Sequence, residues 1–149
     1  MKDQDYSVTI TVQTSPQEAF KAINKVKLWW TENLEGGSQK LNDQFTVQFG
    51  EVHVSTQKVV EMIPDQSVVW LVTESALNFV EDKAEWTGTK ISFDIFQEDG
   101  KTKVRFTHSG LNPAIDCYEA CSNAWGQYIQ QSLKQLINTG KGQPTAKED

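Results

Sequence analysis

Hydrophobic and polar residues alternate over residues 6–12, at the start of the chain. The apolar side of this segment consists of Val8, Ile10 and Val12. Strict alternation of this kind is typical of a half-buried β-strand. A helix is expected directly after it, because Ser15 can act as the N-cap, Pro16 suits the first helical position and Glu18 completes a capping box. A second short helix or turn is expected over residues 26–30.

Alternation returns between residues 44 and 109, where short apolar runs are separated by turn residues. Pro64, Asp65 and Gln66 form one such turn signal. The pair Asp99-Gly100 is a strong signal for a tight hairpin. This region therefore predicts about five further strands that follow one another as an antiparallel meander.

The last part of the chain predicts one long amphipathic helix. Asn112 and Pro113 stand in the order expected of a cap and a first helical residue, and Gly140 is placed to end the helix. The apolar residues that recur at three- and four-residue spacing are Tyr118, Cys121, Trp125, Tyr128, Ile129, Leu133, Leu136 and Ile137. An antiparallel sheet with one apolar face must have that face covered, and this helix is the only predicted element large enough to do so.

These elements predict an α+β fold in which a curved antiparallel sheet of about six strands wraps around the long C-terminal helix. Two short helices follow the first strand. The length of 149 residues is that of one domain, which we assign to residues 1–140. Residues 141–149 contain no large apolar side chain, so we expect a disordered tail there.

Charge and composition narrow the range of partners. The formal net charge is −6, and Arg105 is the only arginine. Phosphate neutralisation by basic residues supplies most of the affinity for nucleic acids, and basic clusters are what anionic membranes attract. We therefore expect neither a nucleic acid nor a membrane as a partner. No stretch approaches the ~20 apolar residues of a membrane span, and no signal segment is visible, so we expect a cytoplasmic protein with reduced cysteines.

Four segments, taken in order, resemble one known family. Residues 14–23 are similar to the opening of the helix-grip superfamily that includes the START-like (SRPBCC) domains. Trp29-Trp30 resembles the tryptophan pair of the branch named for the activator of the Hsp90 ATPase, and residues 104–110 and 124–142 resemble its penultimate strand and closing helix. The resemblance covers residues 6–140. It implies a helix-grip fold whose cavity, between sheet and helix, often holds an apolar or amphipathic molecule, and it implies no shared catalytic set.

Aromatic residues and one histidine are the candidate ligand-binding residues. The facing stripes of sheet and helix supply Trp30, Phe49, Trp70, Phe93, Phe106, His108, Trp125 and Tyr128. Apolar walls are typical of ligand pockets, and core packing is the alternative for the aromatic residues. Strand parity places His108 on the inner face, where an imidazole can orient a polar ligand group or act as a general base. The alternative, which we favour, is a histidine bonded to a nearby carbonyl at the strand end.

The other polar groups are expected to be structural. Cys117 and Cys121 lie one helical turn apart, but a metal site needs three or four ligands, so we expect no metal and no cofactor. His53 falls on the opposite strand face from Val52 and Val54 and is expected to point to solvent. The acidic groups of a predicted loop and a predicted hairpin are expected to be solvated: Glu81, Asp82, Glu85, Glu98 and Asp99.

The sequence favours a domain that binds an apolar or amphipathic small molecule. One alternative is an enzyme, such as a cyclase, dehydratase or hydrolase, that uses His108 in the same cavity. Its second polar group would be Asp94, which parity places outside, or Tyr118 or Tyr128. Another alternative is a protein-interaction module that regulates a chaperone or a different partner. Monomer and homodimer are both compatible with the sequence.

Overall fold

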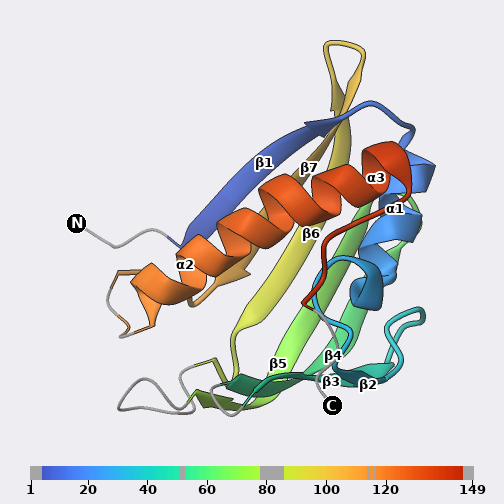
Figure 1. Cartoon of the computed structure of the whole chain (residues 1–149). Coiled ribbons are helices and arrows are strands. Elements are labelled where there is room, and N and C mark those ends of the chain that lie inside the picture. The colour runs from blue at the N-terminus through green and yellow to red at the C-terminus, as the bar shows by residue number, and fades with distance from the viewer. Residues whose placement is uncertain (1–4, 51–52, 78–85, 114, 116, 146–149) are drawn as a thin grey trace.

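A seven-stranded antiparallel sheet forms the body of the protein (Figure 1). The computed structural model describes residues 5–50, 53–77, 86–113, 115 and 117–145. The strands are β1 (Tyr6–Val12), β2 (Leu34–Gly36), β3 (Gln44–Phe49), β4 (His53–Ile63), β5 (Ser67–Leu77), β6 (Lys90–Glu98) and β7 (Lys101–Ser109). Their order in the sheet is β1-β7-β6-β5-β4-β3-β2. The predicted meander is therefore confirmed, and the short edge strand β2 is added to it.

The C-terminal helix lies across the concave face of this sheet (Figure 1). It consists of α2 (Tyr118–Gln127), a wider π-helical segment η2 (Tyr128–Leu133) and α3 (Lys134–Thr139). Gly140 ends it in the left-handed conformation, as predicted. The predicted start at Asn112 and Pro113 is wrong, because hydrogen bonds from Ile115 N–H to Asn112 O and from Tyr118 N–H to Ile115 O form turns there. A cap residue followed by proline also suits a turn, and the helix begins only at Tyr118.

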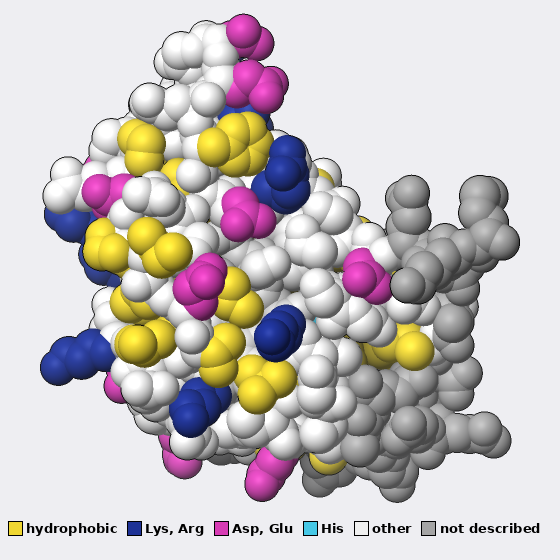
Figure 2. Space-filling model, turned by 180° about the vertical axis from the view of Figure 1, so that it is seen from behind, with side chains coloured by type: hydrophobic (Ala, Val, Ile, Leu, Met, Phe, Trp, Pro, Cys, Tyr) yellow, Lys and Arg dark blue, Asp and Glu magenta, His cyan; other side chains and the backbone are white. Residues whose placement is uncertain are grey.

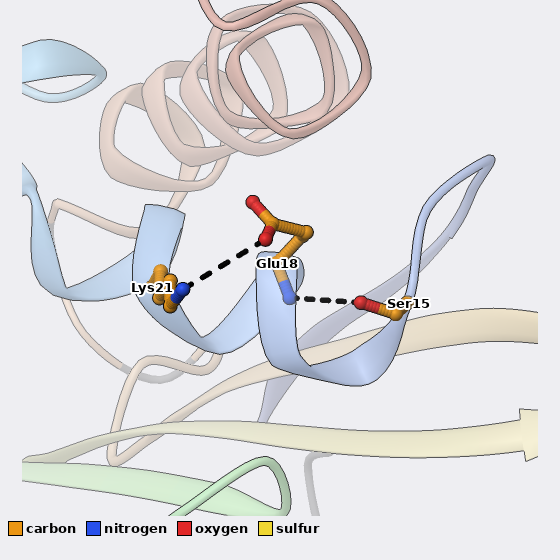
Figure 3. A network of polar contacts seen from close by, with 3 residues as sticks. All are labelled: Ser15, Glu18 and Lys21. Carbon is orange, nitrogen blue, oxygen red and sulfur yellow. Dashed lines mark hydrogen bonds and ion pairs between the residues drawn. The ribbon is translucent and has the colours of Figure 1, made fainter.

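Two short helices precede β2, as the sequence predicts: α1 (Pro16–Asn24) and the 3₁₀ turn η1 (Val26–Leu28). The Ser15 hydroxyl accepts a hydrogen bond of 3.2 Å from the Glu18 backbone N–H (Figure 3). The carboxylate of Glu18 lies 3.9 Å from the Lys21 ammonium one turn further on. The predicted N-cap is thus present, and the helix starts where the local sequence favours it.

The interior lies between the sheet and the helix. The predicted helical stripe is confirmed, because Cys121, Trp125, Ile129, Leu133, Leu136 and Ile137 are buried. The strands β5 to β7 bury an apolar face that consists of Val68, Trp70, Val72, Ile91, Phe93, Ile95, Val104 and Phe106. The register of β4 against β5 shifts between Thr56 and Gln57 and again between Val59 and Glu61. Such bulges increase twist and bend a sheet, and here they lie in its two longest strands.

The opposite face of the molecule carries hydrophobic side chains among lysines and acidic residues (Figure 2). Val60, at one of the bulges, and Ile63, at the end of β4, are the exposed apolar residues of that strand. The guanidinium of Arg105 lies 5.0 Å from the centre of the Phe96 ring. This face is therefore mixed in character, unlike the apolar concave face.

Residues 141–145, which the sequence placed in a disordered tail, run back along the helix. Thr145 forms a parallel bridge with Thr31. The Gln143 N–H donates to the hydroxyl of Ser132, at 2.7 Å. That hydroxyl in turn donates to Trp29 O, also at 2.7 Å. Ser132 thus joins the end of the chain to the segment that carries the tryptophan pair, while residues 146–149 lie outside the described residues.

Replacing Ser132 by alanine tests this junction. The change leaves the buried Trp29 carbonyl and the Gln143 N–H without their partner, and an unsatisfied buried polar group costs about 1–3 kcal/mol. We expect the free energy of unfolding, measured with urea, to fall by about that amount. Ser122, whose hydroxyl bonds Glu119 O in a more exposed part of the same helix, provides the control. Equal losses in the two alanine variants would contradict a structural role for the junction.

Candidate functional site

A pocket of about 210 Å³ opens between the concave face of the sheet and the C-terminal helix. One wall comes from Trp30, β3, β4 and the segment before β6, and the other comes from α2 and the first residue of η2. The lining residues are Trp30, Phe49, His53, Trp86, Ala120, Cys121, Ala124, Trp125 and Tyr128. The pocket has space because the helix presents two alanines and a cysteine to a wall of large aromatic side chains.

Five aromatic side chains of this lining contact one another in a closed circle, which we call the aromatic collar. Its members are Trp30, Phe49, His53, Trp86 and Trp125. The distances between ring centres, in that order around the circle and back to its start, are 5.8, 5.1, 4.6, 5.8 and 4.8 Å. Aromatic contacts of this kind are favourable at 4.5–7 Å. The collar therefore gives the pocket a preformed wall.

The eight predicted ligand-binding residues divide into two groups. Four of them line the pocket: Trp30, Phe49, Trp125 and Tyr128. The other four are fully buried and do not line it: Trp70, Phe93, Phe106 and His108. Trp70 stacks on Trp30 at 6.0 Å, and Phe106 lies 4.7 Å from Trp125. The second group thus forms the core layer that supports the collar. For these four residues, the structure corresponds to core packing, the alternative to a place in the ligand site.

His108 has both ring nitrogens engaged. Its Nδ1 accepts a hydrogen bond of 3.1 Å from the indole N–H of Trp125, so the proton is on Nε2, which lies 2.8 Å from the Thr89 hydroxyl. The Thr89 hydroxyl donates to Trp86 O at 2.6 Å, which leaves its oxygen to accept from His108. Burial lowers the pKa of His108 to about 3. His108 is therefore a neutral structural residue, although its partners are a hydroxyl and an indole and not the carbonyl that we expected.

His53 lines the pocket, and the prediction that it points to solvent is wrong. The inward positions of β4 are His53, Ser55, Gln57 and Val59. Val54, which we placed inside, is the half-buried residue on the outer side, and Val52 lies outside the described residues. Burial lowers the pKa of His53 to about 4, so its ring is neutral at pH 7. The parity was misjudged because Val54 lies on the outer side, whereas the polar residues His53, Ser55 and Gln57 occupy inner positions.

The sequence reasoning missed two aromatic residues of the pocket, His53 and Trp86, and the three small residues that the helix contributes. For His53 a signal existed, because Phe49 pairs directly with His53 across the hairpin and opposite residues of an antiparallel pair share one face. The predicted inward position of Phe49 therefore implied an inward His53. For Trp86 the only signal was a tryptophan in an otherwise polar segment. Its burial is decided by tertiary packing against His53 and Trp125.

The remaining candidate groups show no convergence on a second site. Cys117 and Cys121 are both buried, with no disulfide between them. Among the described residues, no three His, Cys, Asp or Glu side chains are placed to hold a metal ion. Asp94 is exposed, as predicted, and Glu98 pairs with Lys103 at 3.0 Å; Glu81, Asp82 and Glu85 lie outside the described residues. None of the described helices combines the length and apolar character needed to cross a membrane.

The two buried histidines predict how stability depends on pH. Their pKa values fall from 6.5 to about 4 and about 3 on folding, so below pH 6.5 the unfolded chain binds more protons. Stability is therefore full above pH 6.5 and falls as the pH drops toward the folded values. At pH 5, each histidine contributes a slope of about 1.4 kcal/mol per pH unit.

In the His108→Gln variant, the amide can still accept from Trp125 and donate to Thr89. We expect the slope of its unfolding free energy at pH 5 to be smaller than that of the wild type by about 1.4 kcal/mol per pH unit. Urea unfolding of both proteins between pH 4.5 and 7.5 measures it. The carboxylates are common to both chains and cancel in the difference. Identical slopes at pH 5 would show that His108 is not held neutral by the fold.

Comparison with known sequences gives one family. The sequence model described as Activator of Hsp90 ATPase homolog 1-like protein matches residues 13–138. Among the curated proteins, no match was found.

Solved structures share the fold over nearly the whole chain. The Aha1 dimer from Colwellia psychrerythraea, studied in solution, is 29% identical with a TM-score of 0.74, over 93% of this chain and 99% of that one. A protein from Mesorhizobium loti is 16% identical with a TM-score of 0.72, over 90% of this chain and 96% of that one. A protein in the dynemicin biosynthetic locus is 14% identical with a TM-score of 0.66, over 95% of this chain and 49% of that one. The last two show likeness of fold alone.

Proposed function

Because the chain belongs to the family of Activator of Hsp90 ATPase homolog 1-like proteins, we propose that it is a small-molecule-binding domain whose ligand lies between the sheet and the C-terminal helix. The observation that carries this proposal is the aromatic collar around an open pocket. Below the collar, residues such as Trp70 and Phe93 are packed without exposure. A fold that needed only a stable core would be expected to fill this space too, since interiors pack closely.

The volume of the pocket limits the size of the ligand. An apolar cavity of about 150 Å³ holds benzene, and pockets for drug-sized molecules are roughly 300–1,000 Å³. With about 210 Å³, the present pocket suits a molecule of one or two fused rings or a short branched chain. The aromatic wall favours a flat, apolar ligand.

The arrangement supports binding better than catalysis. The enzyme alternative needed His108 as a base, but both of its nitrogens have partners. Of the second groups considered, Asp94 is exposed and Tyr118 does not line the pocket. The hydroxyl of Tyr128 lies 2.5 Å from that of Thr145. Each group that the enzyme alternative relied on thus lies outside the pocket lining or is already bonded.

Filling the pocket from the helix side tests the proposal. Ala124 lines the pocket and is exposed, so Ala124→Phe can occupy the ligand space with little effect on folding. We expect a thermal-shift screen of indoles and of polyketide-like aromatics with one or two rings to give ligands that stabilise the wild type. A ligand at 100 times its Kd adds about 2.7 kcal/mol, which is a rise of a few degrees.

The Ala124→Phe variant should lose these shifts. Asn123→Phe, which adds the same side chain at an exposed neighbouring position that does not line the pocket, should keep them. Ligand shifts that survive unchanged in Ala124→Phe would place the binding elsewhere. A screen without hits on a protein that melts cooperatively would favour a domain that does not bind small molecules.

A second candidate function is regulation of a chaperone ATPase. It is favoured by the description of the family and by the 29% identity to an Aha1 protein. The exposed side chains of Val60 and Ile63 at one end of the sheet offer an apolar contact for a partner. An Hsp90 ATPase rate that does not change on addition of the protein would dispose of this candidate. Because the Colwellia protein was solved as a dimer, a homodimer of this chain is also compatible with the comparisons.

A further inference from the structure

The inner face of β4 carries three consecutive polar side chains, which we call the polar ladder: His53, Ser55 and Gln57. Their exposed fractions are 8%, 1% and 0%. Gln57 Oε1 is enclosed and makes no hydrogen bond within the described residues. Burying polar groups costs free energy unless they are fully bonded. Most of the residues paired with the ladder on β3 and β5 are instead buried and apolar, namely Phe45, Val47, Val72 and Leu77. A conflict of this kind between local chemistry and stability is expected at functional sites.

The hydrogen bonds of the ladder have one direction. Gln57 Nε2 donates to Ser55 Oγ at 2.6 Å. Ser55 Oγ lies 2.8 Å from His53 Nε2, and the hydroxyl proton of Ser55 has no other partner among the described residues. The arrangement that uses this proton has Ser55 donating to His53. The neutral ring of His53 then carries its proton on Nδ1. Because hydrogen bonds in a chain polarise one another, the ladder strengthens the N–H that remains on His53.

The ring of His53 lies in the pocket wall between Phe49 and Trp86, with ring centres at 5.1 and 4.6 Å. Among the nine described residues of the lining, none is Lys, Arg, Asp or Glu. A carboxylate that entered this wall would lose water and meet no cation among these nine residues, and an unpaired buried charge costs several kcal/mol. An uncharged acceptor oxygen gains the hydrogen bond with a smaller loss of hydration.

We propose that His53 Nδ1–H is the recognition group of the pocket and that the ligand is an uncharged one- or two-ring molecule with a carbonyl oxygen as its hydrogen-bond acceptor. Ser55 and Gln57 are positioning residues, which hold the imidazole in the donor tautomer. This inference rests on the proposed function, because it assigns the polar contact of the same pocket.

Three matched probes test the assignment: 2-acetylnaphthalene, 2-ethylnaphthalene and 2-naphthoate. They share one ring system and differ in carrying a neutral acceptor, no acceptor and an anion. Titration at pH 7.5 is followed by NMR on the indole N–H signals, with Trp29 as reference because its indole donates to Ile23 O outside the lining. We expect the ketone to bind about fivefold more tightly than the ethyl compound, which is the range of one net hydrogen bond, and naphthoate to bind most weakly.

Variants distinguish the hydrogen bond that His53 donates from the ring contact that it makes in the pocket wall. His53→Phe keeps a ring in the collar and should reduce the preference for the ketone to about onefold, with binding of the ethyl compound retained. Ser55→Ala should lower the preference and shift the proton of His53 toward Nε2, which the ¹⁵N signals of the imidazole report. Ser75→Ala provides the matched control, because Ser75 lies opposite Ser55 on β5 but its hydroxyl bonds Thr87 and not a residue of the ladder.

The outcomes distinguish this inference from the proposed function. No binding of either neutral probe to the folded protein would count against the small-molecule pocket itself. Equal affinity for the two neutral probes in the wild type would overturn the role of His53 and leave the pocket standing. Tighter binding of naphthoate would replace the neutral acceptor by an anion. Imidazole ¹⁵N signals that place the proton on Nε2 in the wild type would overturn the ladder, even if His53→Phe fails to fold.

Discussion

The contact of Trp125 with the concave face of the sheet is the interaction on which the rest of the structure depends. Its ring meets Trp30, Trp86 and Phe106, which come from three distant parts of the chain. Its N–H donates to the neutral ring of His108 at the end of β7. The helix is thereby fixed at one point, and the small residues that precede Trp125, namely Ala120, Cys121 and Ala124, leave the pocket space that larger side chains would fill.

The wall opposite the helix shows a different balance. On β5 to β7 the inner positions are apolar, so burial there is favourable throughout. On β4 the inner positions are polar up to Val59, and the register shift beside Gln57 bends the sheet at this place. The pocket thus combines an aromatic surface, which would supply affinity for a ligand, with one short polar ladder, which would fix the orientation of the ligand. This division is common in small-molecule sites.

The end of the chain supports the same region from outside. The π-helical segment begins at Tyr128, which lines the pocket, and contains Ser132, which bonds the backbone of residues 29 and 143. Widened helical turns are frequent at functional sites. Here the wider turn coincides with the junction of the helix, the tryptophan pair and residues 141–145. The position of Tyr128 in the pocket wall therefore depends on contacts far apart in the sequence.

Local periodicity determined the order and type of the elements other than β2, and the apolar stripe of the helix. These features follow from spacing along a single segment. The inward side of β4, the burial of Trp86 and the saturation of His108 were decided only by tertiary structure. The physical reason is that the pairing Phe49↔His53 sets which face of β4 is buried. Read alone, the start of this strand gives the opposite answer, because Val54 lies outside and His53 and Ser55 lie inside.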